Sequence, residues 1–79
     1  MKTAKILLPD VESVKRFVDL ANECDFELTL VSGRYQVNAK SIMGIFSLDL
    51  TSPMTLELQT DSEGEANDLL AKADAFLVK

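Results

Sequence analysis

The sequence predicts an α/β (α+β) fold, an open-faced sandwich in which a four-stranded antiparallel sheet carries its helices on one face. Three observations lead to this prediction. Short segments alternate apolar and polar residues, as strands with one buried face do. Other segments repeat apolar residues every three or four positions behind a capping residue. These segments follow each other in the order βαββαβα, without linker, repeat or low-complexity stretch, and such elements bury their apolar sides by packing helices on one face of a sheet.

The first strand is expected over residues 3–8, with Pro9 after it. Asp10 is expected to cap a helix that reaches about Cys24, with Glu12 in its first turn, because acidic residues are favourable at a helix N-terminus. The apolar residues of this helix form one predicted stripe: Val11, Val14, Phe17, Val18, Ala21 and Cys24.

The next two strands are expected over residues 26–31 and 34–39, paired antiparallel through a hairpin turn at Ser32 and Gly33. Gly33 would supply the positive φ of that turn. After a central segment that begins at Ser41, residues 51–53 interrupt the chain and residues 54–59 alternate as a fourth strand.

The last helix is expected to begin at Ser62, which forms a capping box with Glu65. Its predicted buried stripe has six members: Ala66, Leu69, Leu70, Ala73, Phe76 and Leu77.

Length and composition limit the classes of function. A chain of 79 residues is expected to be a single domain, 1–79, of ordinary globular composition. Its net charge of −5 repels a phosphate backbone, so we expect no nucleic acid as a partner. No stretch approaches the ~20 apolar residues of a membrane span, and the first residues do not form a signal peptide. We therefore expect a cytoplasmic protein without membrane insertion.

No residue pattern predicts an enzyme. Cys24 is the only cysteine and the chain has no histidine, so neither a disulfide nor a Cys-His nucleophile pair is available. The acidic runs are expected to be solvated helix ends rather than a metal site. The three glycines form no phosphate-binding loop. We expect no metal and no cofactor.

The central stretch 38–50 reads Asn-Ala-Lys-Ser-Ile-Met-Gly-Ile-Phe-Ser-Leu-Asp-Leu. It resembles the central helix of HPr, the phosphocarrier protein of the bacterial sugar phosphotransferase system, in its Ala-Lys-Ser start and in the spacing of its apolar residues. The first helix, the second strand and the Glu-rich approach to the last helix are also similar to that family. The resemblance covers essentially the whole chain and implies the HPr-like fold.

The same resemblance exposes a missing residue. HPr proteins carry the phosphoryl group on a histidine in a motif H-x-R-P at the start of the first helix. Gapless alignment from Phe17 places Asp10, Val11, Glu12 and Ser13 opposite that motif. Two acids in place of an imidazole and a guanidinium repel a phosphoryl group. Asp10 is thus read as a helix cap, with an acyl-phosphate on its carboxylate as the alternative.

Ser41 matches the serine that a dedicated ATP-dependent kinase phosphorylates in many HPr proteins. The resemblance implies a regulatory phosphorylation site, at which the phosphate would meet the N–H groups of Met43 and Gly44 and the positive end of the helix. The alternative is that Ser41 only caps the helix.

Ile42, Met43 and Phe46 are too many apolar groups for one short helix to bury if Ile45 and Leu48 face the core. Ile42 and Met43 match residues with which the family contacts its partner proteins. The three side chains are interpreted either as a partner-binding surface or as the edge of a small core.

Three functions remain open at this point. The first is an HPr-like regulatory or protein-binding module without phosphohistidine transfer, whose partners would be phosphotransferase-system enzymes or an HPr kinase. The second is a divergent phosphocarrier in sugar transport. The third is a ferredoxin-like small-molecule sensing domain, since βαββαβα order is shared by unrelated folds.

Overall fold

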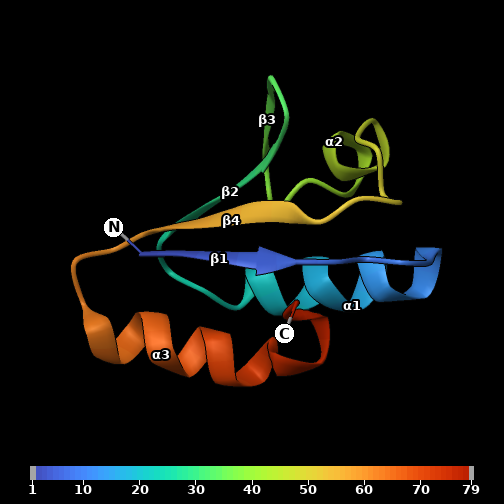
Figure 1. The fold of residues 1–79 in the computed structure, drawn as a ribbon. Coiled ribbons are helices and arrows are strands. Elements are labelled where there is room, and N and C mark those ends of the chain that lie inside the picture. Colours follow the sequence, from blue (N-terminus) through green and yellow to red (C-terminus); the bar gives the residue numbers. More distant parts are fainter. Residues whose placement is uncertain (1, 79) are drawn as a thin grey trace.

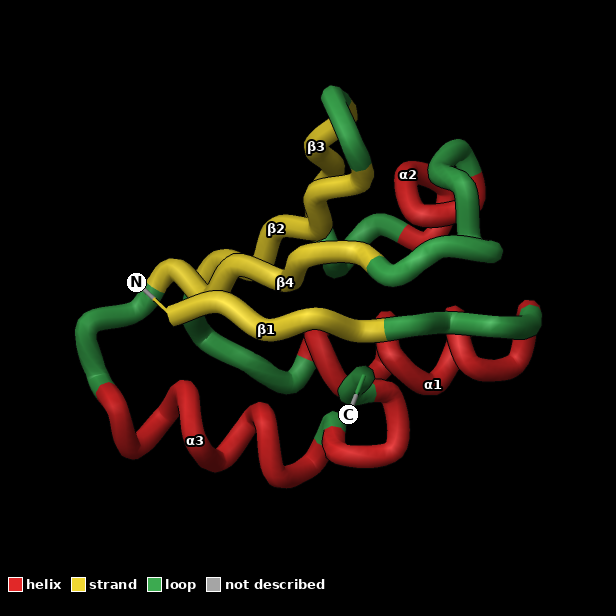
Figure 2. The backbone as a smooth tube through the Cα atoms, viewed as in Figure 1, coloured by secondary structure: helices red, strands yellow, loops and turns green. Residues whose placement is uncertain are grey.

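The computed structural model describes residues 2–78. Its elements are β1 (Lys2–Ile6), α1 (Val11–Asn22), β2 (Glu27–Ser32), β3 (Tyr35–Asn38), α2 (Ile42–Phe46), β4 (Met54–Gln59), α3 (Glu63–Lys72) and the short 3₁₀ helix η1 (Asp74–Phe76). Figures 1 and 2 show α1 and α3 along one face of the sheet, with α2 apart from α3 and beside β3. The predicted open-faced sandwich and the order of its elements are confirmed.

The sheet has the strand order β1-β4-β2-β3, and every neighbouring pair is antiparallel. Ser32 lies opposite Tyr35, so the β2–β3 hairpin closes through two residues, Gly33 and Arg34. Gly33 has a φ of 60°, a conformation that residues other than glycine rarely adopt, so the predicted role of Gly33 is confirmed.

The core lies between the sheet and the helices. Alternate residues of the two central strands are fully buried, among them Leu30 and Leu56, which face each other across β2 and β4. The ring of Phe17 from α1 meets that of Phe76 edge-on, with centroids 6.0 Å apart. Four residues of the predicted α1 stripe are buried: Val14, Phe17, Val18 and Ala21.

The two ends of the predicted α1 stripe are wrong. Val11 is 55% exposed, because it is the first residue of the helix and has no turn before it to hold it against the core. The helix ends at Asn22, and Cys24 lies half-buried in the loop that follows. The N–H groups of Glu23 and Cys24 donate to the carbonyls of Leu20 and Ala21 and so close the last turn.

The C-terminal part of the chain also differs from the prediction. α3 ends at Lys72, and the chain then turns so that Leu77 pairs with Ile6 at the edge of β1. The N–H of Leu7 donates to the carbonyl of Phe76 at 2.9 Å, so the residue after β1 pairs with the C-terminal segment, and β1 ends at Ile6 rather than at the predicted Leu8.

Only one half of the predicted capping box is present at the start of α3. The N–H of Glu65 donates to Ser62 Oγ at 3.3 Å, as expected. The N–H of Ser62 donates instead to Thr60 Oγ1 at 3.1 Å, so it does not need the Glu65 carboxylate.

Candidate functional site

Two helix N-termini carry the residues that the sequence singled out. The first belongs to α1, where Asp10 adopts an extended backbone and its carboxylate accepts the N–H of Ser13 at 2.7 Å. This hydrogen bond from the Ser13 backbone, followed by one from its side chain, lowers the pKa of Asp10. The capping role of Asp10 is confirmed, and the carboxylate already occupies the position at which this helix end would receive an anion.

Glu12 adds a second negative charge one residue into the helix. Its carboxylate meets the Arg16 guanidinium at 2.8 Å, with both side chains more than 70% exposed. This guanidinium is the only cation paired with an acid in α1, and it faces solvent. The structure thus places Asp10, Glu12 and Ser13 together as a solvated, acidic helix start.

The second helix N-terminus belongs to α2. Ser41 is exposed, and its Oγ accepts the N–H of Gly44 at 3.3 Å, so the predicted capping role is confirmed. Gly44 allows this short helix to lie close to β3, because a Cβ atom at position 44 would lie 3.3 Å from Val37 Cβ. Ile45 and Leu48 point into the core, as expected.

The three apolar residues of the predicted partner surface are exposed to different extents. Met43 is 78% exposed and Phe46 is 39% exposed, whereas Ile42 is partly buried and packs against the core. Met43 therefore cannot be read as the edge of the core, and Ile42 can. Together the Ser41 hydroxyl, Met43 and Phe46 form an exposed surface on α2, here called the α2 surface.

The chain before α2 is held to the end of α1 by contacts that sequence reasoning missed. Lys40 Nζ donates to the carbonyl of Cys24 at 2.8 Å, and its own N–H donates to Asn38 Oδ1 at 2.9 Å. Asn22 Nδ2 donates to the carbonyl of Val18 at 2.9 Å and, at 3.4 Å, to that of Lys40. No local pattern predicts the contact of Lys40 Nζ with Cys24 or that of Asn22 with Lys40, because these join residues 16 and 18 positions apart.

The described part of the chain holds neither a metal site nor a membrane-spanning helix. Within residues 2–78, no group of three or more Cys, Asp or Glu side chains is arranged to hold a metal ion. No helix in the same range is long and apolar enough to cross a membrane.

Comparison with known proteins identifies the family and agrees with the fold described above. The family model described as "PTS HPr component phosphorylation site" matches residues 12–77, beginning two residues after Asp10. No curated protein matches.

Solved structures of HPr proteins have the same fold. HPr-C-His from Thermoanaerobacter tengcongensis is 29% identical, with a TM-score of 0.76 over 92% of this chain and 90% of that one. Phosphocarrier protein HPr from Bacillus anthracis is 29% identical, with a TM-score of 0.66 over 89% and 90%. Crh of Bacillus subtilis, titled a catabolite repression protein, is 28% identical, with a TM-score of 0.65 over 96% and 88%.

The fold and the family match define a small phosphocarrier-like protein of the sugar phosphotransferase system, a class of carriers rather than enzymes. The chain belongs to the HPr family. The ferredoxin-like sensing domain is not favoured, since the family match and these structural neighbours are all of the HPr type.

Proposed function

We propose that this chain is an HPr-family regulatory or protein-binding module of the cytoplasm that does not transfer phosphate through histidine. The observation that carries the proposal is the start of α1, where the Asp10 carboxylate caps the helix. Gapless alignment from Phe17 puts Asp10 opposite the family's phosphohistidine. The 79 residues contain no histidine that could replace it.

The chemistry of this helix start supports the proposal. A phosphoryl carrier needs a nucleophile near neutral pH and cations around the transferred group. Asp10 has a lowered pKa, and the same gapless alignment puts Glu12 opposite the family's arginine. Two carboxylates would repel a phosphorylated donor, and an acyl-phosphate on Asp10 would have to break the cap to Ser13.

The α2 surface, together with the partly buried Ile42 beside it, is the proposed working surface. We propose that an HPr kinase phosphorylates Ser41, whose exposed hydroxyl lies at the positive end of a helix. Ile42, Met43 and Phe46 would contact partner proteins of the phosphotransferase system, with the flexible Met43 side chain giving an adaptable contact. The divergent phosphocarrier remains the second candidate, because the family as a whole consists of carriers.

The decisive experiment is the intact mass of the purified protein after two separate reactions. One contains ATP and an HPr kinase, and the other contains phosphoenolpyruvate and the first enzyme of the relay. We expect one added phosphate in the kinase reaction, absent from Ser41→Ala, and none in the phosphoenolpyruvate reaction. Phosphate gained from phosphoenolpyruvate would overturn the proposal and favour the carrier.

The partner surface has its own test. Met43→Asp and Ile42→Asp are expected to abolish binding to a phosphotransferase-system protein, and Tyr35→Asp serves as the matched control because Tyr35 is 72% exposed outside α2. If both α2 variants bind as the unmodified protein does, the surface has no role in recognition.

A further inference from the structure

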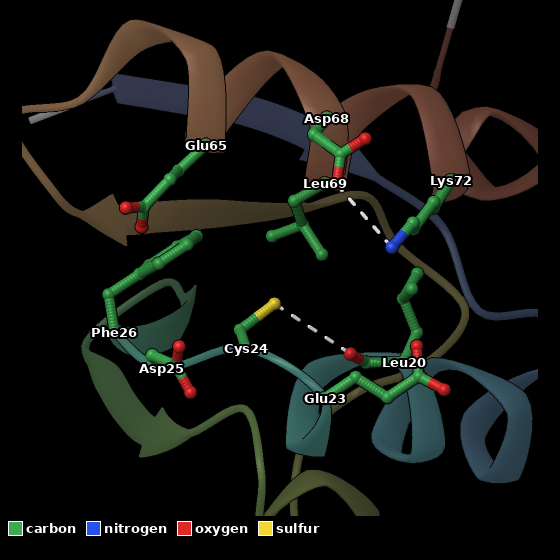
Figure 3. Close-up of a pocket in the computed structure, with 9 residues that line it drawn as sticks. All are labelled: Leu20, Glu23, Cys24, Asp25, Phe26, Glu65, Asp68, Leu69 and Lys72. Carbon is green, nitrogen blue, oxygen red and sulfur yellow. Dashed lines mark hydrogen bonds and ion pairs between the residues drawn. The ribbon is translucent and has the colours of Figure 1, made fainter.

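A groove of about 290 Å³ lies between the C-terminal end of α1, the loop that follows it and α3 (Figure 3). None of the residues proposed above for phosphorylation or partner contact lines it. What this groove binds is therefore a question separate from the proposed function.

The floor of the groove is apolar. Leu20, Cys24 and Phe26 line it as partly buried residues that pack against the core, and the nearly buried Leu69 belongs to that core. Figure 3 shows Leu69 and Cys24 pointing toward each other from opposite walls, with Phe26 at one end and Leu20 at the other. These side chains offer a small apolar contact between polar walls, enough for one apolar side chain of an occupant.

The rim of the groove is acidic. Carboxylates line it on both walls, Glu23 and Asp25 beside α1 and Glu65 and Asp68 on α3. The one lysine in the lining, Lys72, is already paired with Asp68 at 3.4 Å. Nearby Lys40 is engaged by the carbonyl of Cys24. Within residues 2–78, Glu23, Asp25 and Glu65 have no ion-pair partner, so the rim attracts cations.

The size of the groove and the chemistry of its lining limit the class of ligand that it can bind. A volume of about 290 Å³ is at the lower limit of small-molecule pockets, which span roughly 300–1,000 Å³, and suits one or two side chains. The rim carboxylates do not converge as metal ligands within the described residues. Burial, as the largest cause, raises the pKa of the Cys24 thiol, so a covalent thiolate ligand is not favoured.

We propose that this groove is a docking site for a basic peptide segment of a partner protein, which inserts an apolar side chain between Leu69 and Cys24 and places arginine or lysine side chains against the acidic rim. Charge complementarity selects the segment, and the apolar floor distinguishes a peptide from a simple polycation.

The proposal is tested by titrating the isotopically labelled protein with a short peptide that carries one central leucine between arginines, and by following backbone amide shifts. We expect the amides of Cys24, Asp25 and Leu69 to shift. Glu23→Lys combined with Asp25→Lys is expected to weaken binding about fivefold, since it removes two exposed charge pairs. Glu23 is the C-cap of α1, where positive charge is favourable, and Asp25 lies in the loop that follows.

The matched control is Asp19→Lys combined with Asp61→Lys, which changes the net charge equally at exposed positions outside the groove. It is expected to leave the affinity unchanged. Replacing the peptide's leucine by serine should weaken binding, and spermidine should not reproduce the shifts. The proposal is overturned if the peptide does not bind, if both double variants weaken it equally, if spermidine produces the same shifts, or if the shifts lie at Met43 and Phe46. Thermal melts of both variants verify that they are folded.

Discussion

The helix cap at Ser41 allows a quantitative prediction that links stability to the proposed phosphorylation. Ser41→Ala removes the acceptor of the Gly44 N–H, a hydrogen bond of 3.3 Å at the start of α2. Loss of a serine cap typically costs about 0.5–2 kcal/mol. This bond is longer than the usual ~2.9–3.0 Å, so we expect a value near the lower limit, about 0.5–1 kcal/mol.

The chain offers a matched comparison at the start of α3. Ser62 Oγ also accepts an N–H, that of Glu65, at 3.3 Å. Ser62→Ala should therefore cost a similar free energy of unfolding, although α3 has ten residues and α2 has five. A loss of about 0.5–1 kcal/mol corresponds to a fall in Tm of about 2–8 °C for a domain of this size.

Ser41→Asp keeps a capping oxygen at the start of α2 but removes the hydroxyl group. Aspartate is as good an N-cap as serine and adds negative charge at the positive end of the helix, so this variant should be at least as stable as the unmodified protein. The assay is urea unfolding at neutral pH, followed by circular dichroism, for all three variants. The reasoning is refuted if Ser41→Asp loses as much stability as Ser41→Ala, or if Ser41→Ala loses none.

Three further predictions concern the core, the α1 cap and the cysteine. Leu56→Ala should lower the free energy of unfolding by about 2–5 kcal/mol in urea titrations, because Leu56 is fully buried in a central strand, whereas a loss under about 1 kcal/mol would contradict this packing. Asp10→Asn keeps a capping oxygen but removes the charge. Because folding lowers the pKa of Asp10, its charge stabilises the protein above the ordinary Asp pKa of about 3.9, and this contribution is lost as the pH falls through the lower folded pKa. In melts at decreasing pH, the difference in stability between the unmodified protein and Asp10→Asn should therefore shrink below about pH 3.9. A difference that stays constant would refute the stabilising role of the Asp10 charge. Alkylation of Cys24 by iodoacetamide at mildly alkaline pH should be slower in the folded than in the unfolded protein, because burial raises the pKa of its thiol; equal rates would show that the thiol is freely solvated.

Local patterns predicted most of the fold because each one has a local cause. Alternation placed Leu28, Leu30 and Leu56 in the core, and three side-chain oxygens were correctly expected to cap helices. The positive φ of Gly33 likewise follows from the two-residue turn. In each case the signal lies within a few residues of sequence, although the core contacts of the leucines join distant strands.

The predictions that were wrong concern features that local spacing does not determine. Val11 follows the helical spacing and yet is exposed, because spacing gives the face of a residue but not where the neighbouring layer ends. Cys24 lies beyond the end of α1, because a tight last turn satisfies the carbonyls of Leu20 and Ala21. The groove beside α3 was not predicted, since Cys24 and Leu69 meet only through the packing of distant segments.

The two capped helix starts differ in the group that occupies the positive end of the helix. Both attract negative charge, since both present unpaired N–H groups and the positive end of the helix dipole. At α1 the charge is permanent, because Asp10 is a carboxylate with a lowered pKa that holds the Ser13 N–H. At α2 the cap is the neutral hydroxyl of Ser41, exposed and held by a long hydrogen bond. In the regulation proposed above, a phosphate added to that hydroxyl would give α2 the kind of negative charge that α1 already carries, and this modification would require no histidine.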